Sequence, residues 1–269
     1  MIWPAVEMPL QLYTHLILVC CHATFHGDNP DDEASWILQD FQRSNTATGK
    51  AGEHYTFMQH IAAGTSILAK DPSALLLFSG GKTQTQVDTT EAESYQRVSS
   101  ILNGRPGIHN APYDSHLTAR CDVERHATDS MQNLLFSIIR FRQLTGAYPE
   151  QVTVITHAFK ELRFLELHGP AIRYPGDRLR VYGINPPMTI AELRDVQDGE
   201  RKRGFDPFLK DPYGAGEVLG KKRITRGWDA GVIGRISDGL EDEVKRLLEW
   251  TGGASGQETF NERLLWARH

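Results

Sequence analysis

Two short stretches combine residue types that can hold an anion and move a proton. Residues 79–83 read SGGKT, and the stretch EAES begins at Glu91 after a polar loop. Glycine amides can approach an anion closely, lysine adds positive charge, and a carboxylate can accept a proton. The Walker A pattern is absent, so the sequence does not predict a nucleoside triphosphate site. The alternative is that Gly80 and Gly81 only turn the chain.

A second group of charged residues lies in THAFKELR, residues 156–163. Lys160 and Arg163 are three positions apart, which places them on one face of a helix. Two cations on one face can bind a phosphate, carboxylate or sulfate group. The alternative is that they form surface pairs with the neighbouring glutamates.

Two further stretches are candidates for the same site. HATFHGD contains His22, His26 and Asp28, a set of metal-ligand types without the fixed spacing of a zinc motif, so we predict no metal and keep these three as weak candidates. His22 also suits acid/base work because imidazole titrates near neutrality. TDSMQN, residues 128–133, opens a helix in which Asp129 or Thr128 is the expected cap. Its other polar residues face either the pocket or solvent.

The elements that must position these residues alternate between strand and helix. We predict strands at 14–22, 73–79, 151–156 and 179–184, and helices at 53–70, 89–102, 129–145 and 158–168. Strands that alternate with helices indicate a parallel sheet, whose carboxyl ends meet at one edge. The third helix has an apolar stripe formed by Leu134, Leu135, Ile138, Ile139 and Phe141. Residues 23–52 are expected to form a long ordered loop, held by an apolar group of Trp36, Ile37, Leu38 and Phe41.

After residue 187 the composition changes, and helical patterns occur at 189–203, 237–251 and 257–268. We expect this C-terminal part to pack on the sheet. The sequence therefore predicts a single α/β domain over 1–269, with a core at about 12–187 and a helical extension at about 188–269.

The bulk composition limits the class of protein. The 269 residues carry a net charge of -5, which argues against nucleic acid or an anionic membrane as a partner. The basic run at 221–223 (KKR) is then expected to be solvated surface. Three cysteines, two of them adjacent, form no disulfide framework. With no signal peptide or membrane helix expected, we predict a cytoplasmic protein; its oligomeric state stays open.

These motifs, taken in order, resemble the SanA/YdcF-like family (domain of unknown function 218), and in particular its uncharacterised fungal members. The fungal resemblance extends to three other stretches: WILQDFQ at 36–42, YGINPP at 182–187 and DPYGAGEVLGKKR at 211–223. The resemblance implies a Rossmann-like, mainly parallel sheet with the functional residues at its C-terminal edge. The matching positions are Ser79, Gly80, Gly81, Glu91, Ser130, Asn133, Thr156 and Arg163.

This chain departs from the bacterial members at two positions, with Gln132 in place of a glutamate and Lys160 in place of a histidine. If these two residues are catalytic in the bacterial members, this chain either catalyses a different reaction or uses His22, Glu91 or His157 instead. Bacterial relatives are linked to envelope biogenesis, and one is reported to bind S-adenosylmethionine. We do not expect the envelope role to transfer.

We therefore predict an enzyme that binds a polar or anionic small molecule and performs hydrolase or lyase-like acid/base chemistry. The predicted catalytic residues are His22, Glu91 and His157. The predicted substrate-binding residues are Ser79, Gly80, Gly81, Lys82, Thr83, Ser130, Gln132, Asn133, Thr156, Lys160 and Arg163. No cofactor is predicted, although S-adenosylmethionine or a divalent metal stays open. The alternatives are a transferase or sensor that binds S-adenosylmethionine or a nucleotide, and a non-enzymatic scaffold.

Overall fold

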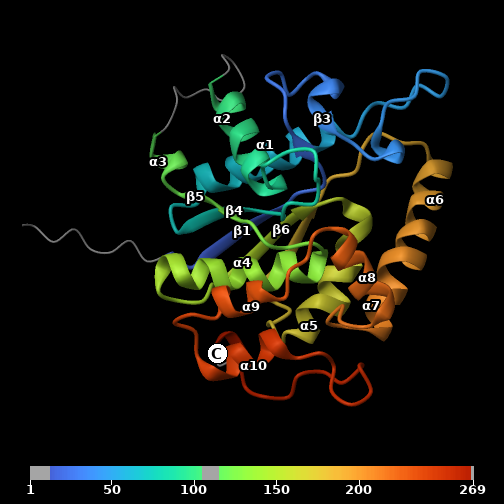
Figure 1. Ribbon diagram of the computed structural model, residues 1–269. Coiled ribbons are helices and arrows are strands. Elements are labelled where there is room, and N and C mark those ends of the chain that lie inside the picture. Colours follow the sequence, from blue (N-terminus) through green and yellow to red (C-terminus); the bar gives the residue numbers. More distant parts are fainter. Residues whose placement is uncertain (1–12, 105–114, 268–269) are drawn as a thin grey trace, which may run out of the picture.

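A five-stranded parallel sheet forms the centre of the protein (Figure 1). The structure is a computed structural model that describes residues 13–104 and 115–267. The strand order is β5-β4-β1-β6-β7, with every pair parallel. The strands are β1 (His15–Cys20), β4 (Ala74–Ser79), β5 (Cys121–Glu124), β6 (Gln151–Thr156) and β7 (Leu179–Gly183). This order confirms the predicted Rossmann-like α/β fold.

Helices cover both faces of the sheet and give it three layers (Figure 1). Helices α1 (His54–Lys70) and α2 (Glu91–Asn103) lie on one face, and α4 (Ser130–Thr145) lies on the other. Alternate residues of the central strand point to opposite faces. In β1, Leu16 and Leu18 pack with the α4 side, whereas Ile17 and Val19 pack with α1 and α2. Burial on both faces explains why this strand is a continuous apolar run.

The sequence predicted the four longer strands and missed β5. Only four residues long, β5 reads Cys-Asp-Val-Glu, so half of its residues are polar. The predicted apolar stripe of α4 is confirmed, because all five of its residues are buried. The predicted helix at 158–168 is irregular: a 3-10 turn at Ala158–Lys160 precedes a π-helical turn at Arg163–His168 and a short α5 at Gly169–Ala171.

The segment between β1 and α1 is ordered, as predicted. It contains the antiparallel pair β2 (Thr24–Phe25) and β3 (Trp36–Ile37), with 3-10 turns at Glu33–Ser35 and Asp40–Gln42. Trp36 and Leu38 are buried and hold this segment against the α1 and α2 side of the sheet. The prediction was wrong for Phe41, which is 69% exposed.

The remaining elements are short. They are α3 (Ser115–Thr118), α6 (Ile190–Glu200), a π-helical turn (Arg201–Phe205), α7 (Asp206–Lys210), α8 (Glu217–Thr225), α9 (Gly231–Ile236), α10 (Asp242–Glu249) and a 3-10 turn (Leu265–Ala267). Among the described residues, no helix has the length and apolar character needed to span a bilayer. Residues 1–12, on which the signal-peptide prediction rests, lie outside the described residues.

The helix predicted at 257–268 is absent over its described residues, 257–267, apart from the last 3-10 turn. The apolar side chains of Phe260, Leu264 and Trp266 are nevertheless buried, although most of the backbone that carries them is irregular. The amide of Phe260 donates to the hydroxyl of Tyr213, and the Trp266 indole donates to the Ile172 carbonyl. These long-range partners replace the hydrogen bonds that a helix would supply.

Candidate functional site

The strand order reverses between β1 and β6, so the chain leaves the carboxyl ends of these two neighbouring strands in opposite directions. In open α/β sheets, ligands bind in the crevice at this reversal. His22 follows β1, while Thr156 ends β6 and Lys160 lies in the turn after it. These three predicted site residues are brought together.

His22 lies between Thr156 and Lys160. Its Nδ1 is 3.4 Å from Lys160 Nζ, and its Nε2 is 3.2 Å from Thr156 Oγ1. A protonated lysine can only donate, so it fixes the tautomer in which His22 accepts at Nδ1 and carries its proton at Nε2. Burial and the Lys160 charge hold the pKa of His22 well below its usual value. His22 is therefore neutral at physiological pH.

The Lys160 ammonium forms no salt bridge with any residue in 13–104 or 115–267. Burial lowers the pKa of Lys160 to about 8, with the positive charge of Arg163 as a further cause. A lysine with a pKa near the operating pH can both attract an anion and deliver a proton.

His157 lies deeper than predicted for a catalytic residue. It is 2% exposed, its ring is stacked on Phe159, and its centroid is 4.5 Å from that of His22. Neither ring nitrogen has a hydrogen-bond partner, and Glu53 Oε2 is 3.6 Å from Nε2. Burial lowers the pKa of His157 and raises that of Glu53. His157 is thus a buried residue whose ring packs close to that of His22.

The two glycine amides of SGGKT are already used within the fold. Gly80 N donates to the Glu124 carbonyl at 3.1 Å, and Gly81 N donates to the Ala127 carbonyl at 2.7 Å. A Cβ on Gly80 would lie 2.9 Å from Cys21 Cβ, so glycine is needed here for close packing. The turn interpretation therefore describes Gly80 and Gly81 better than an anion cradle does.

Lys82 and Glu91 differ in their surroundings. Lys82 Nζ pairs with Asp88 at 2.7 Å on the surface. Glu91 is partly buried and accepts a 2.5 Å hydrogen bond from the Thr83 hydroxyl. Burial raises the pKa of Glu91, although Thr83 and the charges of Arg226 and Lys160 act against this. The charge of Lys160 thus acts on Glu91 as well as on His22 and His157, the other two predicted acid/base residues.

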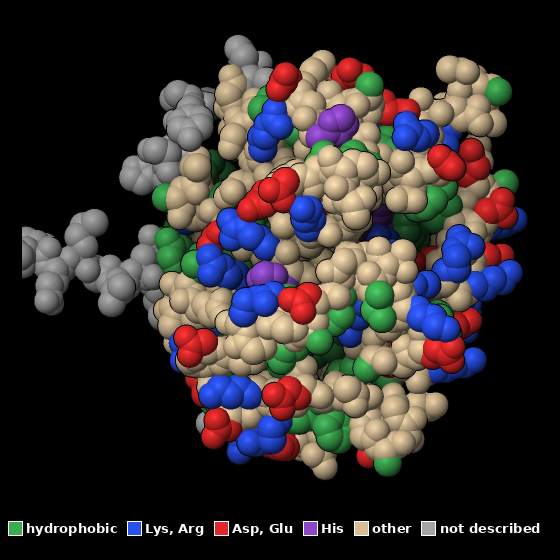
Figure 2. Space-filling model, in the orientation of Figure 1, with side chains coloured by type: hydrophobic (Ala, Val, Ile, Leu, Met, Phe, Trp, Pro, Cys, Tyr) green, Lys and Arg blue, Asp and Glu red, His purple; other side chains and the backbone are tan. Residues whose placement is uncertain are grey.

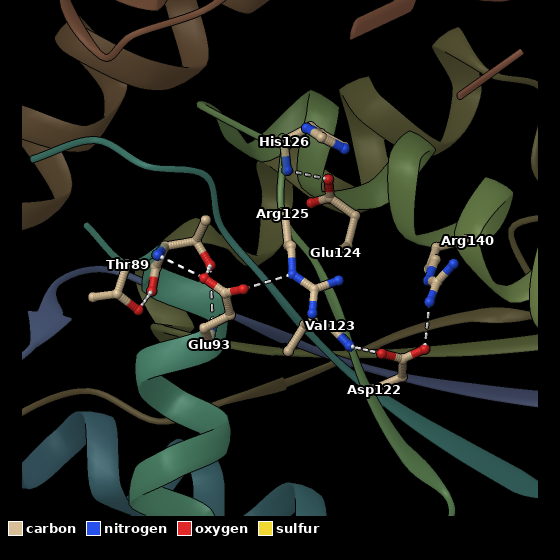
Figure 3. Close-up of polar contacts among 9 residues, drawn as sticks. Thr89, Glu93, Asp122, Val123, Glu124, Arg125, His126 and Arg140 are labelled. Carbon is tan, nitrogen blue, oxygen red and sulfur yellow. Dashed lines mark hydrogen bonds and ion pairs between the residues drawn. The ribbon is translucent and has the colours of Figure 1, made fainter. Parts of the chain in front are cut away.

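A buried carboxyl group lies beside the site and was not predicted. Glu124, at the end of β5, accepts hydrogen bonds from the Ser79 hydroxyl at 2.6 Å and from the Ala127 amide. It also accepts from the His126 amide (Figure 3). Burial raises its pKa to about 7, against these hydrogen bonds. Asn133 Oδ1 lies 3.0 Å from the same Ser79 hydroxyl. Ser79 and Asn133 are buried and serve this network.

Figure 3 also shows how β5 is fixed between its neighbours. Arg125 pairs with Glu93 of α2, and Asp122 pairs with Arg140 of α4. The edge strand that carries Glu124 is therefore held on both sides.

The start of α4 serves structure more than ligand binding. Asp129 caps the helix by accepting from the Gln132 amide, as predicted. Gln132 is buried, and its Oε1 accepts from both the amide and the hydroxyl of Thr128. Ser130 accepts from Arg163 Nη1 at 2.9 Å and lies 2.8 Å from His168 Nε2.

Arg163 is neutralised by a partner from the C-terminal extension. Its Nε donates to Glu200 Oε1 at 2.7 Å, and a second nitrogen contacts the other carboxylate oxygen. A Cβ on Gly204 would lie 2.5 Å from Arg163 Nη2, so Gly204 leaves room for this pair. Arg163 thus orients the site, whereas Lys160 keeps an unneutralised charge.

The basic run at 221–223 was expected to be solvated. Lys221 and Lys222 are exposed, as expected, but Arg223 packs against the start of α4. Arg223 pairs with Asp129 at 2.6 Å, and both side chains are largely buried. Arg226 Nη1 donates to the Thr128 carbonyl at 2.7 Å. Of the KKR run, Lys221 is solvated and pairs with Glu217. The expectation failed for Arg223 because its partner lies 94 residues away in the chain.

The weak metal candidates are not gathered. His26 and Asp28 are exposed, and Asp28 pairs with Arg97. Across residues 13–104 and 115–267, no group of three His, Cys, Asp or Glu side chains is arranged to hold a metal ion.

His22, Glu91 and Lys160 each keep partial solvent exposure, so a ligand can reach them from the carboxyl edge of the sheet. Figure 2 shows the surface hollowed to the right of its centre, with a histidine and a Lys or Arg side chain at the back of the hollow.

Comparison with known proteins gives one fungal relative. The chain is 26% identical over 256 aligned residues to Uncharacterized protein YOR238W of Saccharomyces cerevisiae, an alignment that covers 78% of this chain and 82% of the yeast protein. No family model matches the chain. The name of the relative states no activity or substrate.

Proposed function

We propose that this protein is an enzyme that binds a polar or anionic small molecule at the carboxyl edge of the sheet. One observation carries the proposal: Lys160 lies against His22 at the strand-order reversal, without a carboxylate to neutralise it among the described residues. An unneutralised, partly buried cation attracts an anionic group. The reaction class is hydrolase or lyase-like acid/base chemistry.

The roles follow from the protonation states. Lys160 attracts the anion and donates a proton, because its pKa of about 8 keeps it charged at neutral pH but makes it a better acid than an ordinary lysine. His22 orients the Lys160 ammonium through Nδ1, and Thr156 fixes the His22 ring. Glu91, whose pKa is raised by burial, accepts or returns the second proton.

We also propose membership of the SanA/YdcF-like family, in its fungal branch. The proposal is supported by the fold and by the position of Ser79, Glu91, Thr156 and Arg163 at the same edge of the sheet. A cytoplasmic location is proposed as well, supported by the free thiols of Cys20, Cys21 and Cys121.

A second candidate is a transferase or sensor that binds S-adenosylmethionine or a nucleotide. The strand order favours it, since the same order recurs in nucleotide-binding sheets.

A ligand screen followed by turnover assays tests both candidates. Thermal shift of the full chain is measured with organic acids, phosphorylated metabolites, S-adenosylmethionine and nucleotides, because a ligand of the folded state raises its stability. We expect anionic metabolites to stabilise the wild type and Lys160→Met to abolish the shift. Lys245→Met, which removes an exposed lysine of α10, is the control. An unchanged shift in Lys160→Met refutes the role of Lys160, and a shift with nucleotides alone favours the second candidate.

A further inference from the structure

The turn after α8 places Arg226 at the same edge as Lys160. Arg226 donates to the carbonyl of Thr128, just before α4. The next residue, Gly227, has a φ of 79°, and a Cβ there would lie 3.0 Å from the Lys82 carbonyl. The turn therefore packs between the start of α4 and the loop after β4. Both segments belong to the carboxyl edge of the sheet.

The positive charges at this edge are unequally balanced. Arg163 and Arg223 have carboxylate partners, Glu200 and Asp129. Lys160 and Arg226 have no such partner in the described part of the chain, and the side chain of Arg226 makes a single hydrogen bond to the described residues. A guanidinium carries five N–H groups, so most of those of Arg226 stay available.

Arg226, Lys160 and Glu91 affect one another without touching. The charge of Arg226 lowers the pKa of both Lys160 and Glu91. No hydrogen bond or salt bridge links any two of these three described side chains. The geometry places Arg226 and the Lys160 segment at one site on the sheet edge. Arg226 donates to Thr128, and Ser130, two residues further on, accepts from Arg163, which follows Lys160 by three residues.

Two cations at one edge of the sheet, neither with a carboxylate partner among the described residues, favour a dianion as ligand. A carboxylate neutralises one cation, whereas a phosphate monoester carries about two charges and three acceptor oxygens. Arginine binds phosphate through its planar fork, and lysine binds it as a point charge. Burial raises the pKa of Glu91, which disfavours a negative charge on this carboxyl group beside a bound anion.

We propose that Lys160 and Arg226 together bind the phosphate group of a phosphomonoester substrate. The C-terminal extension then completes the active site instead of only covering the sheet. This inference rests on the proposed function and narrows its substrate class.

The test is titration calorimetry of the full chain with inorganic phosphate, and with acetate as the monoanionic comparison. We expect phosphate to bind the wild type at least about tenfold more tightly than acetate. Arg226→Gln is expected to weaken phosphate binding roughly tenfold and acetate binding less than about threefold. Arg226→Lys keeps the positive charge but not the planar guanidinium. Its phosphate affinity should fall between those of the wild type and Arg226→Gln. Arg235→Gln, which removes an exposed arginine of α9 paired with Asp229, is the matched control and should change neither.

The outcomes separate this inference from the proposed function. If Lys160→Met loses phosphate binding while both Arg226 variants keep it, the inference is wrong and the proposed function stands. Equal affinity of the wild type for phosphate and acetate also overturns the phosphomonoester inference, but it leaves the proposed function standing. If neither anion binds at roughly 10 mM, the anion site itself is wrong and both fall. Far-UV circular dichroism of each variant establishes that it is folded.

Discussion

Replacing Glu124 by glutamine should change how stability depends on pH. In the folded protein, burial raises the pKa of Glu124 from 4.5 to about 7, which at about 1.36 kcal/mol per pKa unit corresponds to about 3 kcal/mol. Between these two values the folded state holds a proton that the unfolded state has lost. Stability contributed by this proton is present below about pH 4.5 and is lost as the pH rises through about 7.

Glutamine cannot ionise, so the Glu124→Gln variant does not lose this stability as the pH rises. The unfolding free energy of the variant, measured by urea denaturation and taken relative to the wild type, should rise by about 3 kcal/mol from pH 5 to pH 8. The comparison removes the contributions of other titrating groups, because they are shared. Glu249→Gln, at an exposed position in α10, is the control and should stay within about 0.5 kcal/mol throughout. A Glu124→Gln difference that does not vary with pH would mean that the Ser79 hydroxyl and the two amides stabilise the carboxylate as well as water does.

Three further substitutions test the packing around the site. Gly183→Ala should destabilise the protein by about 1–3 kcal/mol in urea unfolding and weaken ligand binding, because the new Cβ would lie 2.4 Å from Ala158 Cα and shift the turn that carries Lys160. An unchanged unfolding midpoint would show that this turn moves at no cost in stability. Asp129→Ala removes both a helix cap and a buried partner of Arg223, so the free energy of unfolding should fall by about 3–5 kcal/mol. Glu217→Ala, which breaks an exposed pair in α8, should lower it by less than about 1 kcal/mol. Equal losses in the two variants would contradict the argument that burial makes the Asp129 pair important. Leu134→Ala, at a fully buried position of α4, should cost about 2–5 kcal/mol in the same assay, and a smaller loss would indicate that the cavity collapses.

The sequence predicts those parts of the fold that have a strong local pattern. The run Leu16 to Val19 is apolar on both faces and therefore reads as a buried strand. The stripe of α4 recurs at helical spacing, and Asp129 marks its start through a side chain that can bond the first free amides. In each case the physical cause lies within a few residues of its effect.

Features that depend on distant partners could not be predicted. Helix 257–268 was expected from the spacing of its apolar residues, yet Trp266 and Phe260 are held by Ile172 and Tyr213. Whether a cation of the site is neutralised also depends on residues that are distant in the chain. Lys160 and Arg163 look equivalent in sequence, but only Arg163 meets a carboxylate, Glu200, which is 37 residues away. No local signal distinguishes the two cations.

The C-terminal extension is continuous with the core in its packing as well as in its charges. One hydrophobic cluster includes Leu16 of β1, Leu134 of α4, and Phe208, Val232 and Trp266 of the extension. Helices α9 and α10 lie on the α4 side of the sheet in Figure 1. Because this packing fixes α8, it also fixes the direction of the turn that follows α8. The apolar contacts on one face of the sheet thus determine which charged groups reach its carboxyl edge. The proposed phosphate site combines Lys160 from before residue 187 with Arg226 from after it.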